Sequence, residues 1–353
     1  MDADVSDDEA DSLGLLLAPV DKNRFQNALC RLNTLFNCYA TTCPAPLPAP
    51  GLIVTPEIRT QCERYLPIAG ITSLFNRLYA AALTCPPILS STPFHNAMSW
   101  ADAFLALAPE FQFSPNPARL LETLLDDHNM RTRFLFASFL PNRFYGVIGR
   151  YPEQRTYIRE WLTSRRGKRL RCLDAACGTG EDTYGLALLL SEKGFSPETI
   201  RIDGWTVEPL EVWAATRRRF PHDHRREVLL RKETTTLFEQ GFGTSIRFRC
   251  VDLTTFPLSL LLSQGEGGIG NGFDLIVCNG LLGGPIIHER AVMNRMVENL
   301  SQLLTPGGLL LAADNFHGGW KKKCPHKNLR ASFEQSGLNS FEAGEGLGGL
   351  KPY

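Results

Sequence analysis

The feature that most constrains the fold is a glycine turn set between an apolar segment and a helical one. Residues 171–174 read Arg-Cys-Leu-Asp, residues 178–180 read Gly-Thr-Gly, and two acids then open an apolar run that extends to Leu190. This order predicts a β-strand, a tight loop and an α-helix. Because glycine has no Cβ, the loop backbone can bend sharply and a ligand can lie against its peptide groups. The unit therefore predicts a ligand site at the end of a strand.

The residues of this loop argue against a phosphate ligand. The third glycine of a dinucleotide-binding fingerprint is replaced by Thr183, and no Lys-Ser or Lys-Thr pair follows. Glu181 and Asp182 would repel phosphate and attract a positively charged ligand. A cationic ligand is therefore expected.

The sequence Asp-x-Ala-Cys-Gly-Thr-Gly-Glu-Asp-x-Tyr at 174–184 resembles the first motif of class I S-adenosylmethionine-dependent methyltransferases. Its second half is most similar to the CheR-type, or chemotaxis receptor, methyltransferases. The resemblance implies S-adenosyl-L-methionine as the cofactor and S-adenosyl-L-homocysteine as the product. The residues that it places at the cofactor are Asp174, Ala176, Gly178, Gly180 and Glu181.

From residue 170 onward, apolar strand segments alternate with helical segments. The alternation predicts an α/β fold with a doubly wound, mostly parallel sheet, and the resemblance implies a Rossmann-like methyltransferase sheet of seven strands. Earlier in the chain, helical segments are expected at about 25–39, 56–83, 97–108, 117–129 and 130–140. The expected division is an acidic flexible tail at 1–12, a mostly helical N-terminal domain at 13–149 and a methyltransferase domain at 150–353.

Three later segments also read as strands that end in a polar residue: 200–207 before Glu208 and Pro209, 245–251 before Asp252 and Leu253, and 273–278 before Asn279. The resemblance implies that Glu208 binds the two ribose hydroxyls, with Pro209 beside it. It also implies that Asp252 accepts from the adenine amino group next to Leu253, and Asn279 is the cofactor candidate on the fourth strand. A plain helix-start acid is the alternative for Glu208, because the helix dipole favours an acid there.

Arg150 precedes a helical segment that has a proline near its start. In CheR-type enzymes an arginine at this place binds the carboxylate of the methyl donor, and Arg150 is the residue that matches. The alternative, that Arg150 only caps or solvates a helix end, remains open.

The acceptor side departs from the CheR pattern. Where that family has Arg-Asn and soon afterwards Tyr, this chain has Asn279-Gly280 followed by Leu-Leu-Gly-Gly. We therefore expect a small-molecule acceptor. The alternatives are a CheR-like protein carboxyl (glutamate) O-methyltransferase and a non-catalytic regulatory protein that binds S-adenosylmethionine. A carboxylate acceptor needs no base, whereas a hydroxyl or amine could use His317 or Tyr184 as catalytic residue, although a surface position is equally typical of His317.

The composition gives no indication of nucleic acid or a membrane as partner. Lys and Arg total 37 and Asp and Glu total 37, so the net charge is zero. Seven basic residues between 217 and 232 are interrupted by acids and lack interleaved aromatics, which favours a solvated helix face over a nucleic-acid patch. The ten cysteines form no Cys-x-x-Cys pair and the N-terminus is acidic, so a cytoplasmic protein without a metal site is expected. The oligomeric state is not indicated.

Overall fold

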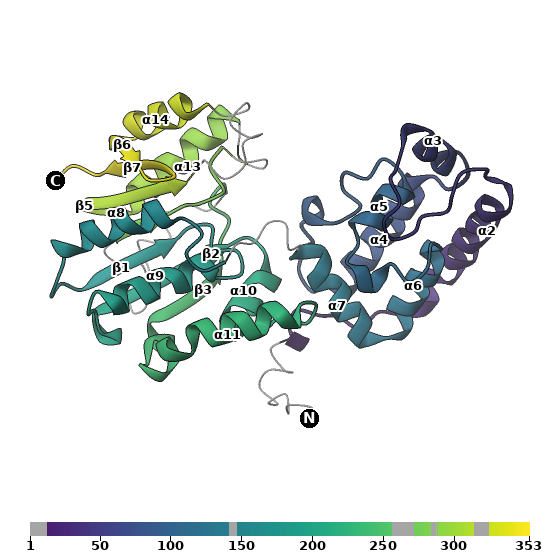
Figure 1. Cartoon of the computed structure of the whole chain (residues 1–353), viewed down its shortest axis with the longest axis horizontal. Coiled ribbons are helices and arrows are strands. Elements are labelled where there is room, and N and C mark those ends of the chain that lie inside the picture. Colours follow the sequence, from purple (N-terminus) through teal and green to yellow (C-terminus); the bar gives the residue numbers. More distant parts are fainter. Residues whose placement is uncertain (1–12, 141–146, 256–271, 284–286, 288, 314–324) are drawn as a thin grey trace. The chain divides into compact units, whose positions relative to one another are not determined.

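A computed structural model gives the fold (Figure 1) and describes residues 13–140, 147–255, 272–283, 287, 289–313 and 325–353. The chain divides into two compact units, one of Met1–Tyr145 with Phe220–His224 and the other of Gly146–Arg219 with Arg225–Tyr353. The boundary lies between residues 145 and 146, whereas the sequence suggested 149 and 150. The sequence did not indicate that Phe220–His224 belongs with the first unit.

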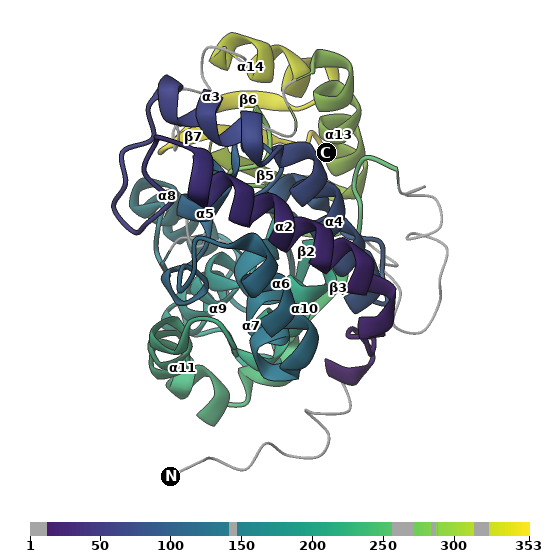
Figure 2. The same ribbon diagram turned by 90° about the vertical axis from the view of Figure 1, so that its right-hand side faces the viewer.

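The first unit is helical. Its α-helices are α2 (Gln26–Thr42), α3 (Pro56–Tyr65), α4 (Ile68–Ala82), α5 (Trp100–Ala106), α6 (Pro117–Asp126) and α7 (His128–Phe139), with the short 3-10 helices η1 (Lys22–Phe25), η2 (Leu89–Ser91) and η3 (Pro109–Phe111). Helices α2 and α6 pack side by side (Figure 2). The expected helical stretch 56–83 is two helices, because Pro67 has no N–H to donate and α4 begins directly after it.

Aromatic side chains form the core of this unit. The rings of Phe75 and Phe94 stack with centroids 4.4 Å apart, and those of Tyr79 and Phe134 stack at 5.8 Å. Tyr79 is fully buried, and its hydroxyl is 2.9 Å from Oγ of Ser138. Burial raises the pKa of Tyr79, so the hydroxyl stays neutral and serves as a hydrogen-bond donor.

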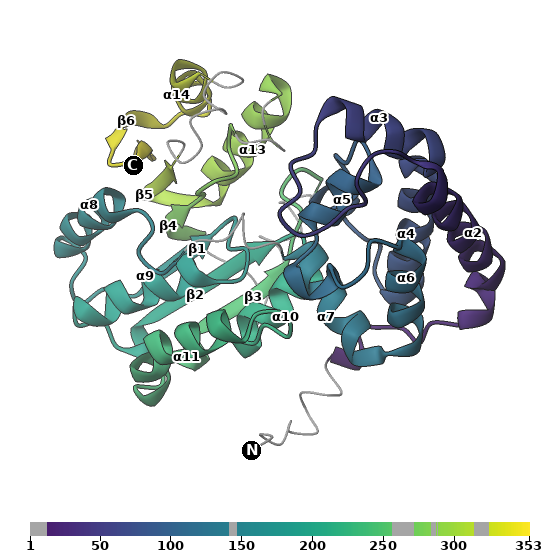
Figure 3. The ribbon, with the colours of Figure 1, turned by 45° about the vertical axis from the view of Figure 1, so that its right-hand side comes forward.

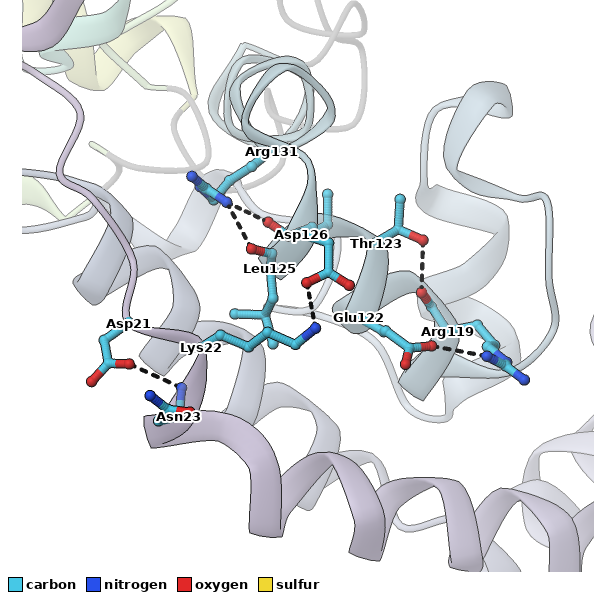
Figure 4. Close-up of polar contacts among 10 residues, drawn as sticks. Asp21, Lys22, Asn23, Arg119, Glu122, Thr123, Leu125, Asp126 and Arg131 are labelled. Carbon is cyan, nitrogen blue, oxygen red and sulfur yellow. Dashed lines mark hydrogen bonds and ion pairs between the residues drawn. The ribbon is translucent and has the colours of Figure 1, made fainter.

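The junction of α6 and α7 is held by polar contacts that Figure 4 shows. Asp127 caps α7, because its side chain accepts from the backbone N–H groups of Asn129 and Met130 at 2.8 and 3.0 Å. Arg131 Nη1 donates to the carbonyl oxygen of Leu124 at 2.7 Å, which satisfies a group that α6 leaves open at its end. Lys22 pairs with Asp126 across the same corner.

The second unit contains a seven-stranded sheet, which confirms the predicted fold class. Its strands are β1 (Leu170–Asp174), β2 (Ile200–Thr206), β3 (Ile246–Cys250), β4 (Phe273–Val277), β5 (Leu304–Ala313), β6 (Asn339–Ala343) and β7 (Gly346–Leu350). The order is β3-β2-β1-β4-β5-β7-β6, and Figure 3 shows it from β6 at one edge to β3 at the other. All neighbouring strands are parallel except β7, which is antiparallel to both β5 and β6.

Helices cover both faces of the sheet. They are α8 (Pro152–Thr163), α9 (Glu181–Glu192), α10 (Pro209–Arg217), α11 (His224–Glu239), α13 (Arg290–Leu303) and α14 (His326–Gln335), with the 3-10 helices η5 (Pro197–Thr199) and η6 (Phe242–Ser245). On one face, Met296 and Leu300 of α13 join a buried cluster with Leu173, Ile276 and Leu310 of the strands. In the part of the chain that the structure describes, no helix combines the length and apolarity needed to cross a membrane.

The other face leaves no room for a side chain at Gly204 of β2. A Cβ there would lie 2.7 Å from Cδ1 of Phe248 and 3.1 Å from Oγ1 of Thr183 on α9. Helix α9 can therefore approach β2 closely only because residue 204 is glycine.

We predict that Gly204→Ala lowers the free energy of unfolding by about 1–3 kcal/mol, the usual cost of overfilling a packed interior. Gly70→Ala is the control, because a Cβ at Gly70 of α4 meets nothing within 4 Å and alanine favours a helix. Urea denaturation followed by circular dichroism measures both. Equal stabilities of the two variants would contradict the packing argument.

Candidate functional site

The predicted site residues meet at one edge of the sheet. Asp174 is the last residue of β1, and Glu208, Asp252 and Asn279 lie just beyond the ends of β2, β3 and β4. Because these four strands are parallel neighbours, their carboxyl ends share an edge, which is where open α/β sheets bind ligands (Figure 3). Residues that are far apart in the sequence are thus brought together by strand pairing.

The loop between β1 and α9 needs both of its glycines in the left-handed region. Gly178 has φ +50° and Gly180 has φ +91°, and the Gly180 N–H donates to the carbonyl oxygen of Cys177 at 2.8 Å. A Cβ on Gly180 would also lie 2.9 Å from Cζ of Phe248 and 3.1 Å from Cβ of Ala215. Gly180 is therefore required by the packing of α9 on the sheet as well as by the turn.

A pocket lies beside this loop, between one face of α8 with the residues before it and one face of α9. It is lined by Gly149, Arg150, Tyr151, Gln154, Arg155, Ile158, Asp174, Asp182, Gly185, Leu186, Leu189, Val277 and Asn279. The sequence predicted three of these as site residues, namely Arg150, Asp174 and Asn279. The guanidinium carbon of Arg150 lies 5.6 Å from the centroid of the Tyr151 ring.

Glu181, a predicted cofactor residue, is not among the residues that line this pocket. Its Oε1 accepts from Nε of Arg226 on α11 at 2.8 Å, and its Oε2 accepts from Oγ1 of Thr179 at 2.7 Å. The side chain of Arg226 is only 13% exposed, so the predicted solvated face is wrong at this residue. Asp182 lines the pocket instead, because successive helix positions are rotated by about 100°.

Two carboxyl groups line the pocket, that of the buried Asp174 and that of the partly buried Asp182. Burial raises the pKa of Asp174, although its Oδ2 accepts from Oγ1 of Thr183 at 2.7 Å and the N–H of Ala176 also stabilises its charge. Burial and the neighbouring Asp174 raise the pKa of Asp182, and Arg150 and Asn279 only partly oppose this. A cation in the pocket would favour the ionised form of both groups.

Asn279 is fixed by a pair of amide hydrogen bonds to Gln154 of α8. Gln154 Nε2 donates to Oδ1 of Asn279 at 3.0 Å, and Asn279 Nδ2 donates to Oε1 of Gln154 at 2.9 Å. The N–H of Ala313 also donates to Oδ1 of Asn279 at 2.9 Å. Both amides are buried, so this pair holds α8 against the carboxyl ends of β4 and β5.

Glu208 caps α10, and Pro209 occupies the first position of that helix. The Glu208 Oε1 accepts from the N–H of Leu210 at 3.2 Å, as the helix-start alternative requires. Among the described residues, no hydrogen bond reaches its Oε2, so a ribose hydroxyl could donate there. Burial raises the pKa of Glu208 to about 7.

The carboxylate of Asp252 accepts hydrogen bonds from residues of the turn that follows it. Its Oδ1 accepts from the N–H and the hydroxyl of Thr254 at 2.8 and 2.6 Å, and its Oδ2 accepts from the hydroxyl of Thr255 at 3.0 Å. Burial alone would raise the pKa of Asp252, but these hydrogen bonds lower it below its usual value. An adenine amino group would have to use a remaining lone pair. Leu253 is buried in the core cluster under α13.

The structure removes Tyr184 as a candidate base. The side chain is 1% exposed, and its hydroxyl donates to the carbonyl oxygen of Ala215 at 2.7 Å. Burial raises its pKa further above the ordinary value. His317 lies outside the described residues.

Most of the pocket residues were missing from the predicted set, among them Tyr151, Gln154 and Asp182. Helical periodicity could have indicated them, because Tyr151, Gln154, Arg155 and Ile158 follow one helical stripe, and Asp182, Gly185, Leu186 and Leu189 follow another.

Comparisons with known proteins assign a family to part of the chain. Residues 150–317 match the CheR methyltransferase, SAM-binding domain family. The probable biofilm formation methyltransferase WspC of Pseudomonas putida is 27% identical over 168 residues, which are 46% of this chain and 38% of that protein. A chemotaxis protein methyltransferase of Listeria monocytogenes is 28% identical over 157 residues, which are 42% of this chain and 54% of that protein.

Among solved structures, the chain is similar to the N-methyltransferase NodS of Bradyrhizobium japonicum in complex with S-adenosylhomocysteine. It is 17% identical, with a TM-score of 0.39 that covers 64% of this chain and 100% of that one. The fold assignment therefore rests on the strand order and on the family match. Residues 150–317 thus match the CheR-type S-adenosylmethionine-binding domain of methyltransferases, and S-adenosylmethionine is the cofactor of this domain.

Proposed function

We propose that this chain transfers a methyl group from S-adenosylmethionine, by in-line displacement, to a compact small-molecule acceptor. The observation that carries the donor part is the acid-lined pocket beside the glycine loop, with Arg150 at its wall. Arg150 would bind the donor carboxylate, and Asp182 and Asp174 would face its positively charged groups. The nucleoside would lie along the sheet edge toward Glu208.

A sulfonium donor requires few catalytic groups from the protein. The methyl group is already activated, so the residues of the site have to place the acceptor in line with the carbon–sulfur bond and exclude water. A hydroxyl or amine acceptor also has to lose a proton, and His317 remains the candidate base from the sequence.

The charges of the pocket support a neutral or cationic acceptor. Its lining includes two arginines and two aspartates. Arg155 Nη1 already donates to the carbonyl oxygen of Gly185 at 3.1 Å, and Arg150 is assigned to the donor. One arginine of the described lining is thus assigned to the donor, and the other is partly engaged by the backbone of α9. Gly280 lies beside this wall, since a Cβ there would be in ordinary contact with the Tyr151 hydroxyl oxygen, 3.8 Å away.

A protein carboxylate is the second candidate acceptor. It is favoured by the relatives, since one is named a chemotaxis protein methyltransferase and the other a probable biofilm formation methyltransferase. The chain covers only 38% and 54% of the lengths of these two proteins, so their acceptors do not transfer directly.

Glu208→Ala is expected to weaken the binding of S-adenosylhomocysteine by about 1.5–3 kcal/mol, the range for a hydrogen bond to a charged group. Isothermal titration calorimetry measures the affinity. Glu233→Ala, at an exposed position of α11, is the control and should bind as the wild type does. An unchanged affinity in Glu208→Ala would remove this residue from the ribose site.

The buried acids predict that the ligand-free protein loses stability as the pH rises. A carboxyl group with a raised pKa binds more protons in the folded than in the unfolded state, so the free energy of unfolding falls between the unfolded pKa near 4 and the folded pKa, which is about 7 for Glu208. We expect a decrease on the order of 3 kcal/mol from pH 5 to pH 8. Denaturation across this range measures it. Asp182→Asn should flatten the profile, and an unchanged slope would contradict the assignment.

The acceptor is tested with methyl-labelled S-adenosylmethionine and a cell extract whose products are separated by size. We expect label in small molecules. Base-labile label on a protein would instead support the carboxylate acceptor. Label in neither fraction, with normal cofactor binding, would contradict methyl transfer by this chain.

A further inference from the structure

Helix α8 has no cap from its own sequence at its amino end. The N-cap residue is Tyr151, whose side chain makes no capping hydrogen bond, and Pro152 has no N–H. The next two N–H groups are satisfied by the carboxylate of Glu345, which is 191 residues away from Gln154 in the sequence. Glu153 N–H donates to Oε1 at 2.9 Å, and Gln154 N–H donates to Oε2 at 2.8 Å.

Glu345 belongs to the turn that joins β6 to β7, and this turn is pressed against α8. Gly344 has φ +64°, and a Cβ on it would lie 2.4 Å from the Gln154 backbone nitrogen. A Cβ on Gly346 would lie 2.0 Å from the carbonyl oxygen of Ala312 in β5. The carboxylate therefore projects from a turn with little freedom to move.

The helix turn that Glu345 holds carries one wall of the pocket. Arg150 and Tyr151 stand immediately before it, and Gln154 within it makes the amide pair with Asn279. A carboxylate at this place also compensates the positive end of the α8 dipole. Without it, two N–H groups would lose their partner and the first turn of α8 would be free to fray.

We infer that Glu345 is a positioning residue for the amino-acid end of the methyl donor, acting through the first turn of α8 on Arg150. The inference rests on the proposed placement of the donor in this pocket. The nucleoside end would be held at the ends of β2 and β3, by residues that Glu345 does not contact. Loss of Glu345 should therefore weaken only ligands that have the amino-acid moiety.

The test compares S-adenosylhomocysteine with 5′-methylthioadenosine, which has the same nucleoside and thioether sulfur but no amino-acid moiety. In calorimetric titrations, Glu345→Ala should weaken S-adenosylhomocysteine about tenfold, the effect of losing a strong helix cap, and leave methylthioadenosine unchanged. Glu345→Gln keeps the size and one acceptor oxygen, so it should fold as the wild type does and show a smaller loss. Glu342→Ala is the matched control, because Glu342 is exposed on the same hairpin and pairs with Arg330.

Arg150→Ala should reproduce the selective loss, and adding Glu345→Ala to it should weaken S-adenosylhomocysteine no further, because both act on the same ligand group. Equal losses for the two ligands, or no loss in either Glu345 variant, would overturn the inference and leave the donor site intact. A wild-type protein that binds neither compound would overturn the donor site and the inference together.

Discussion

The site depends on the parallel pairing of β3, β2, β1 and β4. Asp174 is the Cα partner of both Gly204 and Val277, so the ends of three strands are locked in register by one hydrogen-bonded ladder. A strand in such a ladder cannot slide by one residue without turning its buried side chains to the opposite face. The same pairing that buries the core therefore fixes where Glu208, Asp252 and Asn279 stand.

Glycine at position 180 is required both by the close packing of α9 on the sheet and by the shape of the loop at the candidate ligand site. Gly180 lies against Phe248 and Ala215, and its left-handed φ starts α9 at the edge of the sheet. Arg226 then ties the loop to α11 through Glu181 and Thr179, in an ion pair that is nearly buried. Part of the sequence motif is thus used to hold the loop in shape, and Asp182 is the acid that faces the pocket.

The pocket keeps carboxyl groups in surroundings that oppose their ionisation. Asp174, Asp182 and Glu208 all have raised pKa values because they are buried, so each disfavours the ligand-free fold near neutral pH. In the proposed donor site, a cationic cofactor would reverse this unfavourable term for the two acids of the pocket. The carboxylates that lower the stability of the ligand-free protein would then increase its affinity for a sulfonium compound relative to an uncharged nucleoside.

The sequence by itself determined the fold class, because strand and helix periods are local features that the chain carries in order. The seven strands and the cofactor were implied by the resemblance of its glycine-loop motif to a methyltransferase family. It also indicated Arg150, Asp174 and Asn279, which the structure places in one pocket. Only the tertiary structure decided that Asp182 rather than Glu181 faces this pocket, and that Tyr184 lies in the core. It alone joined Gln154 to Asn279 and Glu345 to the start of α8. The physical reason is that a sequence motif fixes residue types, whereas the direction of a side chain and its partners from distant segments depend on how helices pack on the sheet.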